Sequence, residues 1–182
     1  MVKKVRLAVF ASGTGTNFQA LNDAIIQRNL NAEIVRLVVD HSKAGVLNLA
    51  KVFGVPTTTI IYSHYLDKTA AEQAIIYQLE SDQVDGILLA GYMRILTPLL
   101  INRYLGKIIN LHPAMLPSFP GRHSILDAFE AGVDKTGVTV HFVDNGIYTG
   151  EIIAQEVVPI KKDDTLEQLE TRINHVEHVL YP

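Results

Sequence analysis

The sequence contains no cysteine, which excludes disulfide bonds, thiolate nucleophiles and thiolate metal ligands. It also lacks an apolar run near the roughly 18 residues that a membrane-spanning helix needs. The N-terminal residues have the basic start and small side chains of a signal peptide, but their apolar run is too short for one. These absences favour a cytoplasmic protein without a membrane anchor.

Concentrated positive charge is absent as well. The formal net charge is −3, the isoelectric point is near 6.1, and clusters of Lys and Arg do not exceed two adjacent residues. This argues against nucleic acid as the main partner, because its phosphates require a basic surface. A phosphorylated small molecule needs only a few well-placed donors and is compatible with this charge.

Repeats, low-complexity segments and linkers are absent too, so we predict a single domain over residues 1–182. Through residue 111, apolar strand-like runs alternate with helical patterns. The predicted strands are residues 5–10, 33–40, 57–61, 86–90 and 107–111, and the intervening helices end at residue 27 or span residues 44–53, 67–83 and 98–104. This alternation predicts a parallel sheet covered by helices on both faces.

The pattern changes in the last third of the chain. A helix is predicted over residues 124–131, and two β-rich runs, 137–143 and 152–160, flank a turn-prone Asp-Asn-Gly. Residues 165–180 have helical spacing and begin with a capping box of Thr165 and Gln168. The predicted fold class is therefore α/β and Rossmann-like, with a mostly parallel central sheet and an antiparallel extension near the C-terminal part.

The most informative stretch is residues 107–123, in which three prolines lie between positions 113 and 120. Proline fixes φ and removes a backbone donor, so this loop is stiff. Asn110 and His112 precede it at a strand end and share one face, since side chains in a strand alternate. An amide that donates to an oxyanion and an imidazole that carries a proton suit chemistry on a carbonyl. The alternative is that His112 is a buried structural group.

Residues 12–17, Ser-Gly-Thr-Gly-Thr-Asn, follow the first strand and open a helix. Free amides at a helix N-terminus suit an anion, so this loop is a candidate phosphate site. It is neither a Walker loop nor a dinucleotide fingerprint, because Phe18 stands where the third glycine belongs; a nicotinamide dehydrogenase would need that glycine. The alternative is a simple strand-to-helix turn.

Residues 90–96, Ala-Gly-Tyr-Met-Arg-Ile-Leu, leave the fourth predicted strand. Apolar side chains with one arginine suit a flat heterocycle, although the same loop could pack Met93 and Leu96 into the core. His112, His123 and His141 invite a metal interpretation, but their spacing matches no ligand pattern, and we predict no metal.

Together, these segments resemble the folate-dependent formyltransferase family over essentially the whole chain. The shared motifs are Asn-Leu-His-Pro at residues 110–113, Leu-Pro-Ser-Phe-Pro-Gly at 116–121 and the motif at 90–96. The loop at 12–17 is similar to that of members that formylate glycinamide ribonucleotide, rather than those that act on tRNA or hydrolyse the folate. The resemblance implies 10-formyltetrahydrofolate as co-substrate, no metal, small-molecule partners only, and a monomer or homodimer.

The resemblance also implies a set of binding residues. Those for the ribonucleotide would be Gly15, Thr16, Asn17, Asn174 and Glu177. Those for the folate would be Lys68, Met93, Arg94, Ile95, Leu96 and Asp144. Lys68 stands where the family usually has an arginine near the folate tail.

For the chemistry, the resemblance implies direct attack of the substrate amine on the formyl carbon. Asn110 and a protonated His112 would stabilise the tetrahedral oxyanion, and His112 would carry the proton. In the family's late loop, an aspartate supports this histidine; here Tyr148 occupies that position, so we expect slow turnover. A catalytically impaired ligand-binding homologue and a formyltetrahydrofolate hydrolase are the alternatives.

Two further expectations come from the same motifs. We predict that the Leu116–Pro117 bond is cis, because prolines crowd this turn. The family usually carries a tail beyond Tyr181-Pro182, and we expect this difference to bear on stability.

Overall fold

The computed structural model describes residues 3–182, and Met1 and Val2, which begin the basic N-terminal stretch, lie outside the described residues. The elements in chain order are β1 (Val5–Phe10), α1 (Thr16–Gln27), β2 (Ala32–Val39), α2 (Val46–Phe53), β3 (Thr57–Thr59), the 3₁₀ turn η1 (Tyr62–His64), α3 (Lys68–Ser81), β4 (Gly86–Leu89), α4 (Pro98–Arg103), β5 (Ile108–His112), α5 (Ser124–Glu130), β6 (Lys135–Phe142), β7 (Ile152–Pro159) and α6 (Leu166–Leu180).

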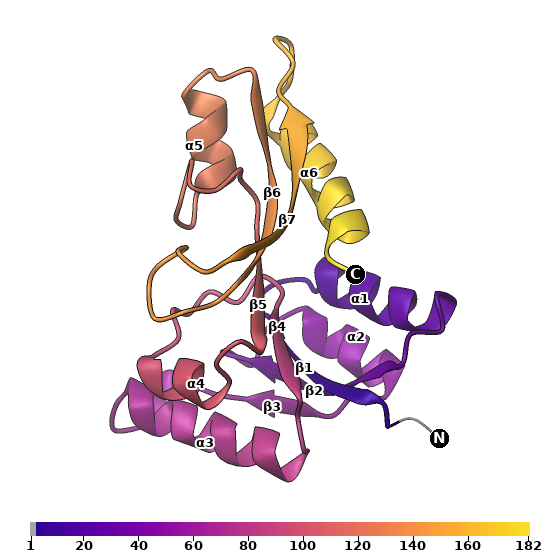
Figure 1. Ribbon diagram of the computed structural model, residues 1–182, viewed down its shortest axis with the longest axis vertical. Helices are drawn as coiled ribbons and strands as arrows, with labels where there is room; N and C mark the ends of the chain where they lie inside the picture. The colour runs from indigo at the N-terminus through magenta and orange to yellow at the C-terminus, as the bar shows by residue number, and fades with distance from the viewer. Residues whose placement is uncertain (1–2) are drawn as a thin grey trace.

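The strands form one seven-stranded sheet in the order β3-β2-β1-β4-β5-β6-β7. The first five strands are parallel, whereas β6 is antiparallel to β5 and β7 is antiparallel to β6. This confirms the predicted fold class, including the antiparallel extension (Figure 1). The third strand ends at Thr59 rather than residue 61, and the turn η1, which we did not predict, follows it.

Helices cover both faces of the sheet because its central strands are apolar on both sides. In β1, Val9 packs in one core cluster, whereas Ala8 and Phe10 pack in the other. The first cluster includes side chains of α1, α2 and α6, and the second includes side chains of α3 and α4. Figure 1 shows α1 and α2 on the opposite side of the strands from α3 and α4. Across residues 3–182, helices of the length and apolarity needed to cross a membrane do not occur.

The strand order reverses at β1, which lies between β2 and β4. The loops after β1 and β4 are joined at this point: Ser12 N–H donates to the Gly91 carbonyl (3.1 Å), and Met93 N–H donates to Ser12 Oγ (2.9 Å). In open parallel sheets, ligands bind outside the carboxyl ends of the strands at such a reversal. The fold therefore places the candidate site at the ends of β1, β4 and β5.

The proline loop is fastened to the antiparallel strands by the buried side chain of Thr139. Its Oγ1 donates to the Ala114 carbonyl (2.6 Å) and accepts from Leu116 N–H (3.1 Å) and from Gln155 Nε2 (2.9 Å). The Leu116–Pro117 bond is cis, as predicted. The stiffness of this loop therefore comes from β6 and β7 as well as from its prolines.

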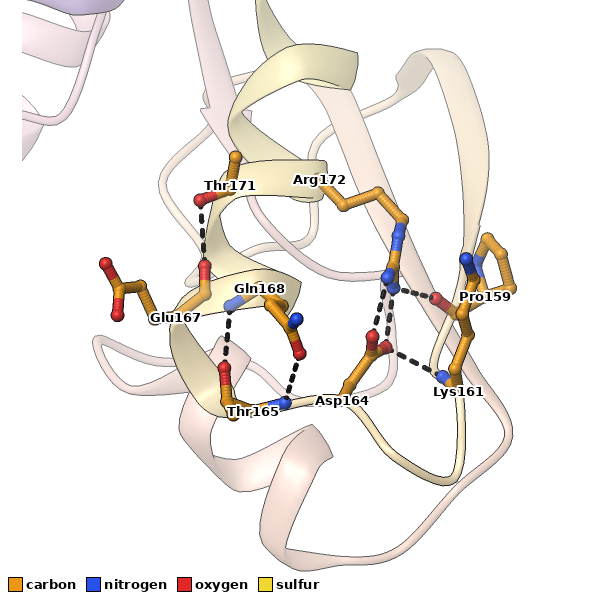
Figure 2. A network of polar contacts seen from close by, with 8 residues as sticks. All are labelled: Pro159, Lys161, Asp164, Thr165, Glu167, Gln168, Thr171 and Arg172. Carbon is orange, nitrogen blue, oxygen red and sulfur yellow. Dashed lines mark hydrogen bonds and ion pairs between the residues drawn. The ribbon is translucent and has the colours of Figure 1, made fainter.

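The start of α6 is tied to the end of β7 (Figure 2). Both bonds of the predicted capping box between Thr165 and Gln168 are present. Arg172 holds the Asp164 carboxylate with two hydrogen bonds of 2.7 Å and also donates to the Pro159 carbonyl. The hydrogen bonds from Arg172 lower the pKa of Asp164 to about 2.

A buried carboxylate supports the other face of the sheet. Glu72 on α3 is fully buried and accepts hydrogen bonds from the backbone N–H (2.9 Å) and the hydroxyl of Thr97, the residue that precedes α4. Free amides at a helix start need such an acceptor, and here another helix supplies it. This contact fixes α4, and with it the loop that leaves β4.

We predict that Glu72→Met lowers the free energy of unfolding by about 2 kcal/mol, because it leaves a backbone donor without its charged acceptor. Urea denaturation of the purified chain measures this. Glu80→Met is the matched control, since Glu80 lies on the same helix in an exposed ion pair with Arg103. The control should lose at most about 1 kcal/mol. Equal losses in the two variants would contradict a special role for Glu72.

Candidate active site

Asn110 and His112 lie at the carboxyl end of β5. In the sheet, β5 has the parallel strand β4 on one side and the antiparallel strand β6 on the other. The register places Asn110 directly opposite His141 of β6, and His112 opposite Thr139. Asn110 is partly accessible, whereas His112 and His141 are each 3% exposed. A second histidine, His141 of the neighbouring strand β6, therefore lies beside the predicted pair of Asn110 and His112.

Asn110 and His141 are hydrogen-bonded, with Nδ2 of the amide 3.1 Å from Nε2 of the imidazole. The other ring nitrogen, Nδ1, lies 2.8 Å from the Phe142 carbonyl. A carbonyl can only accept, so Nδ1 carries a hydrogen, and Nε2 of the neutral ring accepts from the amide. Burial lowers the pKa of His141, which favours this neutral form.

His112 is held by the proline loop. Its Nε2 donates to the Phe119 carbonyl (2.9 Å). Burial lowers the pKa of His112 from its ordinary value near 6.5, and the neighbouring His141 acts in the same direction. The lowered pKa favours the neutral imidazole at pH 7, whereas the resemblance implies a protonated one.

Tyr148 lies beside both histidines. Its ring centroid is 4.6 Å from that of His112 and 6.2 Å from that of His141, and its φ of 58° is in the left-handed region. The Asp144 carboxylate is used within the same loop, where it accepts from Gly146 N–H and from the Thr149 hydroxyl. The loop thus presents an aromatic ring, rather than a carboxylate, to His112.

The first loop brings together three of the predicted ribonucleotide residues. Gly15 precedes α1 with φ of 90°, and a Cβ there would lie 2.5 Å from Val46 Cγ2, so only glycine fits. Because Gly15 has no side chain, it leaves the first amides of α1 uncapped. Asn17 Nδ2 donates to the Glu177 carboxylate (3.0 Å), and burial raises the pKa of Glu177.

The remaining two predicted ribonucleotide residues are exposed to solvent. Thr16 is the first residue of α1, and Asn174 lies on α6, three positions before Glu177. Both are therefore accessible to a ligand beside the Asn17–Glu177 pair.

Several of the predicted folate residues line one cavity of about 410 Å³. Lys68, Arg94 and Ile95 contribute to it, together with Tyr62 and Tyr65. Arg94 is ion-paired with the buried Asp40 (2.9 Å), and its guanidinium lies 5.0 Å from the centroid of the Tyr62 ring. Positive charge and aromatic walls suit an elongated ligand with an aromatic ring and a carboxylate.

The other predicted folate residues differ in accessibility. Met93 and Ile95 are 49% and 61% exposed, whereas Leu96 is 6% exposed and packs in the core with α3 and α4. Leu96 therefore supports the loop from below, and Met93 and Ile95 present an apolar surface.

Sequence reasoning missed two residues of this region. The sequence indicates His141 only as a metal-ligand candidate, because its contact with Asn110 depends on the register of two strands that are separate in the chain. Arg122 was not singled out; it lines the cavity with Lys68 and Arg94 and donates to the Met93 carbonyl (2.8 Å). Its position next to Gly121 at the end of the proline motif was the available signal.

A larger, open groove of about 760 Å³ lies at the start of α6. The Asp164–Arg172 pair of Figure 2 lines it, and none of the predicted site residues does. We therefore place the site at the strand ends. Within residues 3–182, groups of three or more His, Cys, Asp or Glu side chains that could hold a metal ion do not occur.

Comparison with known proteins identifies the family of the chain. Residues 5–182 match the family described as formyl transferase. The chain belongs to this family. The formyl transferase match includes every predicted site residue, from Gly15 to Glu177.

The named proteins that this chain is similar to include several enzymes of purine biosynthesis. The chain is 46% identical to a phosphoribosylglycinamide formyltransferase of Bacillus subtilis, over 97% of the chain and 91% of that protein. A crystal structure of glycinamide ribonucleotide transformylase 1 from Geobacillus kaustophilus matches with a TM-score of 0.96 and 50% identity, covering 100% of this chain and 96% of that one. The human trifunctional purine biosynthetic protein adenosine-3 is 40% identical over 99% of the chain, which corresponds to 18% of that longer protein.

We predict that Tyr148→Asp raises the pKa of His112, because a negative charge beside an imidazole stabilises its protonated form. NMR titration of the His112 ring measures the change. Tyr148→Phe, which removes only the hydroxyl, is the matched control and should leave the pKa low. A pKa that does not rise in the aspartate variant would contradict this expectation, and burial and His141 would then set the pKa of His112.

Proposed function

We propose that this protein transfers the formyl group of 10-formyltetrahydrofolate to the amine of glycinamide ribonucleotide, a step of purine biosynthesis. It acts as a single domain, in the cytoplasm, as a monomer or a homodimer. The observation that carries the proposal is the position of Asn110 and His112 at the end of β5, where an amide and a neutral imidazole share one strand end. The names of the relatives support the same substrates.

The ribonucleotide binds beside the loop of residues 12–17. The uncapped amides at the start of α1, with Thr16 and Asn17, hold its phosphate, because a helix N-terminus favours an anion. Glu177, fixed by its hydrogen bond to Asn17, and Asn174 on the same helix bind the sugar. Gly15 keeps the loop close to α2 and so fixes the direction of these amides.

The folate binds beside the loops that follow β4 and β6. Residues Met93 to Ile95, supported by the buried Leu96, and the loop that begins at Asp144 enclose the pterin, and the exposed apolar side chains of Met93 and Ile95 contact its flat ring. Lys68 and Arg94 line the cavity of about 410 Å³, where their charges attract the carboxylates of the folate tail. The formyl group then lies between the two ligand sides, next to Asn110 and His112.

The chemistry is a direct transfer. The amine nitrogen forms a bond to the formyl carbon, the bond from that carbon to the folate nitrogen breaks, and the proton lost by the amine is gained by the folate nitrogen. Asn110 donates a hydrogen bond to the oxygen that becomes negative, a contribution of about 3 kcal/mol at comparable sites. His112 is neutral and accepts the proton of the attacking amine, a role worth about 10²–10⁴ in rate.

A hydrolase would use water in place of the amine, so its activity would not require the ribonucleotide. A ligand-binding homologue without activity would bind both molecules and release no product. The Asn17–Glu177 pair on the ribonucleotide side, beside Asn110 and His112 at the end of β5, favours the transferase.

We predict that formyl transfer requires the ribonucleotide and that His112→Ala lowers kcat about 10²–10⁴-fold. The assay follows tetrahydrofolate absorbance with and without the ribonucleotide, and calorimetry measures ribonucleotide binding. Binding should survive in the variant, because His112 lies apart from the first loop. Formate release without the ribonucleotide would identify a hydrolase, and binding of both ligands without turnover would identify an inactive homologue.

We also predict that Tyr148→Asp raises kcat of the chain. The new carboxylate stabilises the imidazolium that forms when His112 takes the proton, and the tyrosine side chain has no carboxylate to supply this charge. Steady-state kinetics of the variant and the parent, at saturating folate and ribonucleotide, measure the effect. An unchanged or lower kcat would show that the ring of Tyr148 serves this site better than a carboxylate.

A further inference from the structure

We propose that His141 is a positioning residue that sets the orientation of the Asn110 amide, so that its N–H group faces the reacting formyl oxygen. The inference rests on the proposed function for its chemical meaning, and on the hydrogen bonds of β5 and β6 for its geometry. His141 does not touch the reacting atoms in this arrangement; it acts through Asn110.

The first step of the argument is the contact itself. The antiparallel register puts Asn110 and His141 directly opposite each other, and their side-chain nitrogens are 3.1 Å apart. His141 is 3% exposed, so its ring has little room to turn. The amide of Asn110 therefore meets one defined edge of the imidazole.

The second step is the protonation of that edge. Nδ1 of His141 lies 2.8 Å from the Phe142 carbonyl, which can only accept, so the hydrogen of the neutral ring is on Nδ1. Nε2 then presents a lone pair to Asn110. The amide must face it with Nδ2–H, since the opposite orientation would bring the amide oxygen against a second acceptor.

The third step is the consequence for the reaction. One hydrogen of the Asn110 amide is used by His141, and the other is free to donate. An amide that could turn over would present its oxygen to the developing oxyanion in part of the molecules, and this repulsion would raise the barrier. The carbonyl of Phe142, through His141, thus selects the donor face of Asn110.

Two substitutions of His141 separate this role from a packing role. The side chain of glutamine can place an oxygen near the former Nε2, which keeps an acceptor for Asn110. The side chain of asparagine is shorter and reaches only the region of Nδ1. His141→Asn should lower kcat about 10–100-fold, the range seen when the partner of a functional side chain is removed at metal sites, with KM for both substrates little changed. His141→Gln should restore most of the rate.

His64→Asn is the control, because the His64 side chain is exposed and does not line the cavity to which its neighbours Tyr62 and Tyr65 contribute. Wild-type kcat in both His141 variants would overturn the proposal. Equal losses of kcat in the two variants would also overturn it, because they would indicate packing rather than an acceptor at Nε2.

Nitrogen-15 NMR of the free protein tests the geometry without relying on turnover. We expect His141 to carry its hydrogen on Nδ1, and the side-chain amide signals of Asn110 to shift in His141→Asn but not in His141→Gln. A hydrogen on Nε2 at pH 7 would overturn the inference. Absence of formyl transfer in the wild-type chain would instead overturn the proposed function, and the amide signals would then decide the orientation of Asn110 on their own.

Discussion

The antiparallel pairing of β6 with β5 is the constraint on which the candidate site depends. A parallel sheet alone would end with Asn110 and His112 at its edge, open to solvent on one side. The returning strand covers them, places His141 opposite Asn110, and positions Thr139 to hold the proline loop. The same strand leads into the loop that carries Tyr148. One strand pair thus assembles residues from three parts of the chain.

A second feature is the burial of two imidazoles side by side in the candidate site. His112 and His141 are buried next to each other, and a proton on either would raise the free energy of a proton on the other. Both rings donate to backbone carbonyls, which holds them in place without a carboxylate. The aromatic ring of Tyr148 lies against this pair. Burial therefore lowers the pKa of both imidazoles, and the charge of Asp144 opposes this effect at His141.

Most of the fold could be predicted from the sequence, because apolar runs with β-branched side chains and helical spacings are local signals. The strands at residues 5–10 and 86–90 and the capped helix that ends at Leu180 needed no long-range information. The candidate site was predictable only in part. Asn110, His112 and Gly15 stood in recognisable motifs, whereas the Asn110–His141 contact depends on strand register.

Burial was the other property that the sequence concealed. Glu72 lies on a helix where a charged residue is expected to face solvent, yet it is fully buried because the N–H and hydroxyl of Thr97 need an acceptor. The neutral state of His112 has the same origin, since the pKa depends on surroundings that a linear motif does not describe. A local sequence pattern indicates the chemistry of which a side chain is capable. Its burial and its pKa depend on neighbouring residues that are distant in the chain.

The hydrogen bonds of Thr139 also have a consequence for how the chain folds. The proline loop is held by Thr139 and by Gln155, which lies 39 residues beyond Leu116. The central parallel pair closes a still longer stretch of chain, since Leu7 of β1 pairs with Gly86 of β4. Contacts between distant residues form slowly, because chain entropy must be lost before they stabilise the structure. Both sets of contacts must therefore form before the ends of β1, β4 and β5 and the proline loop lie together.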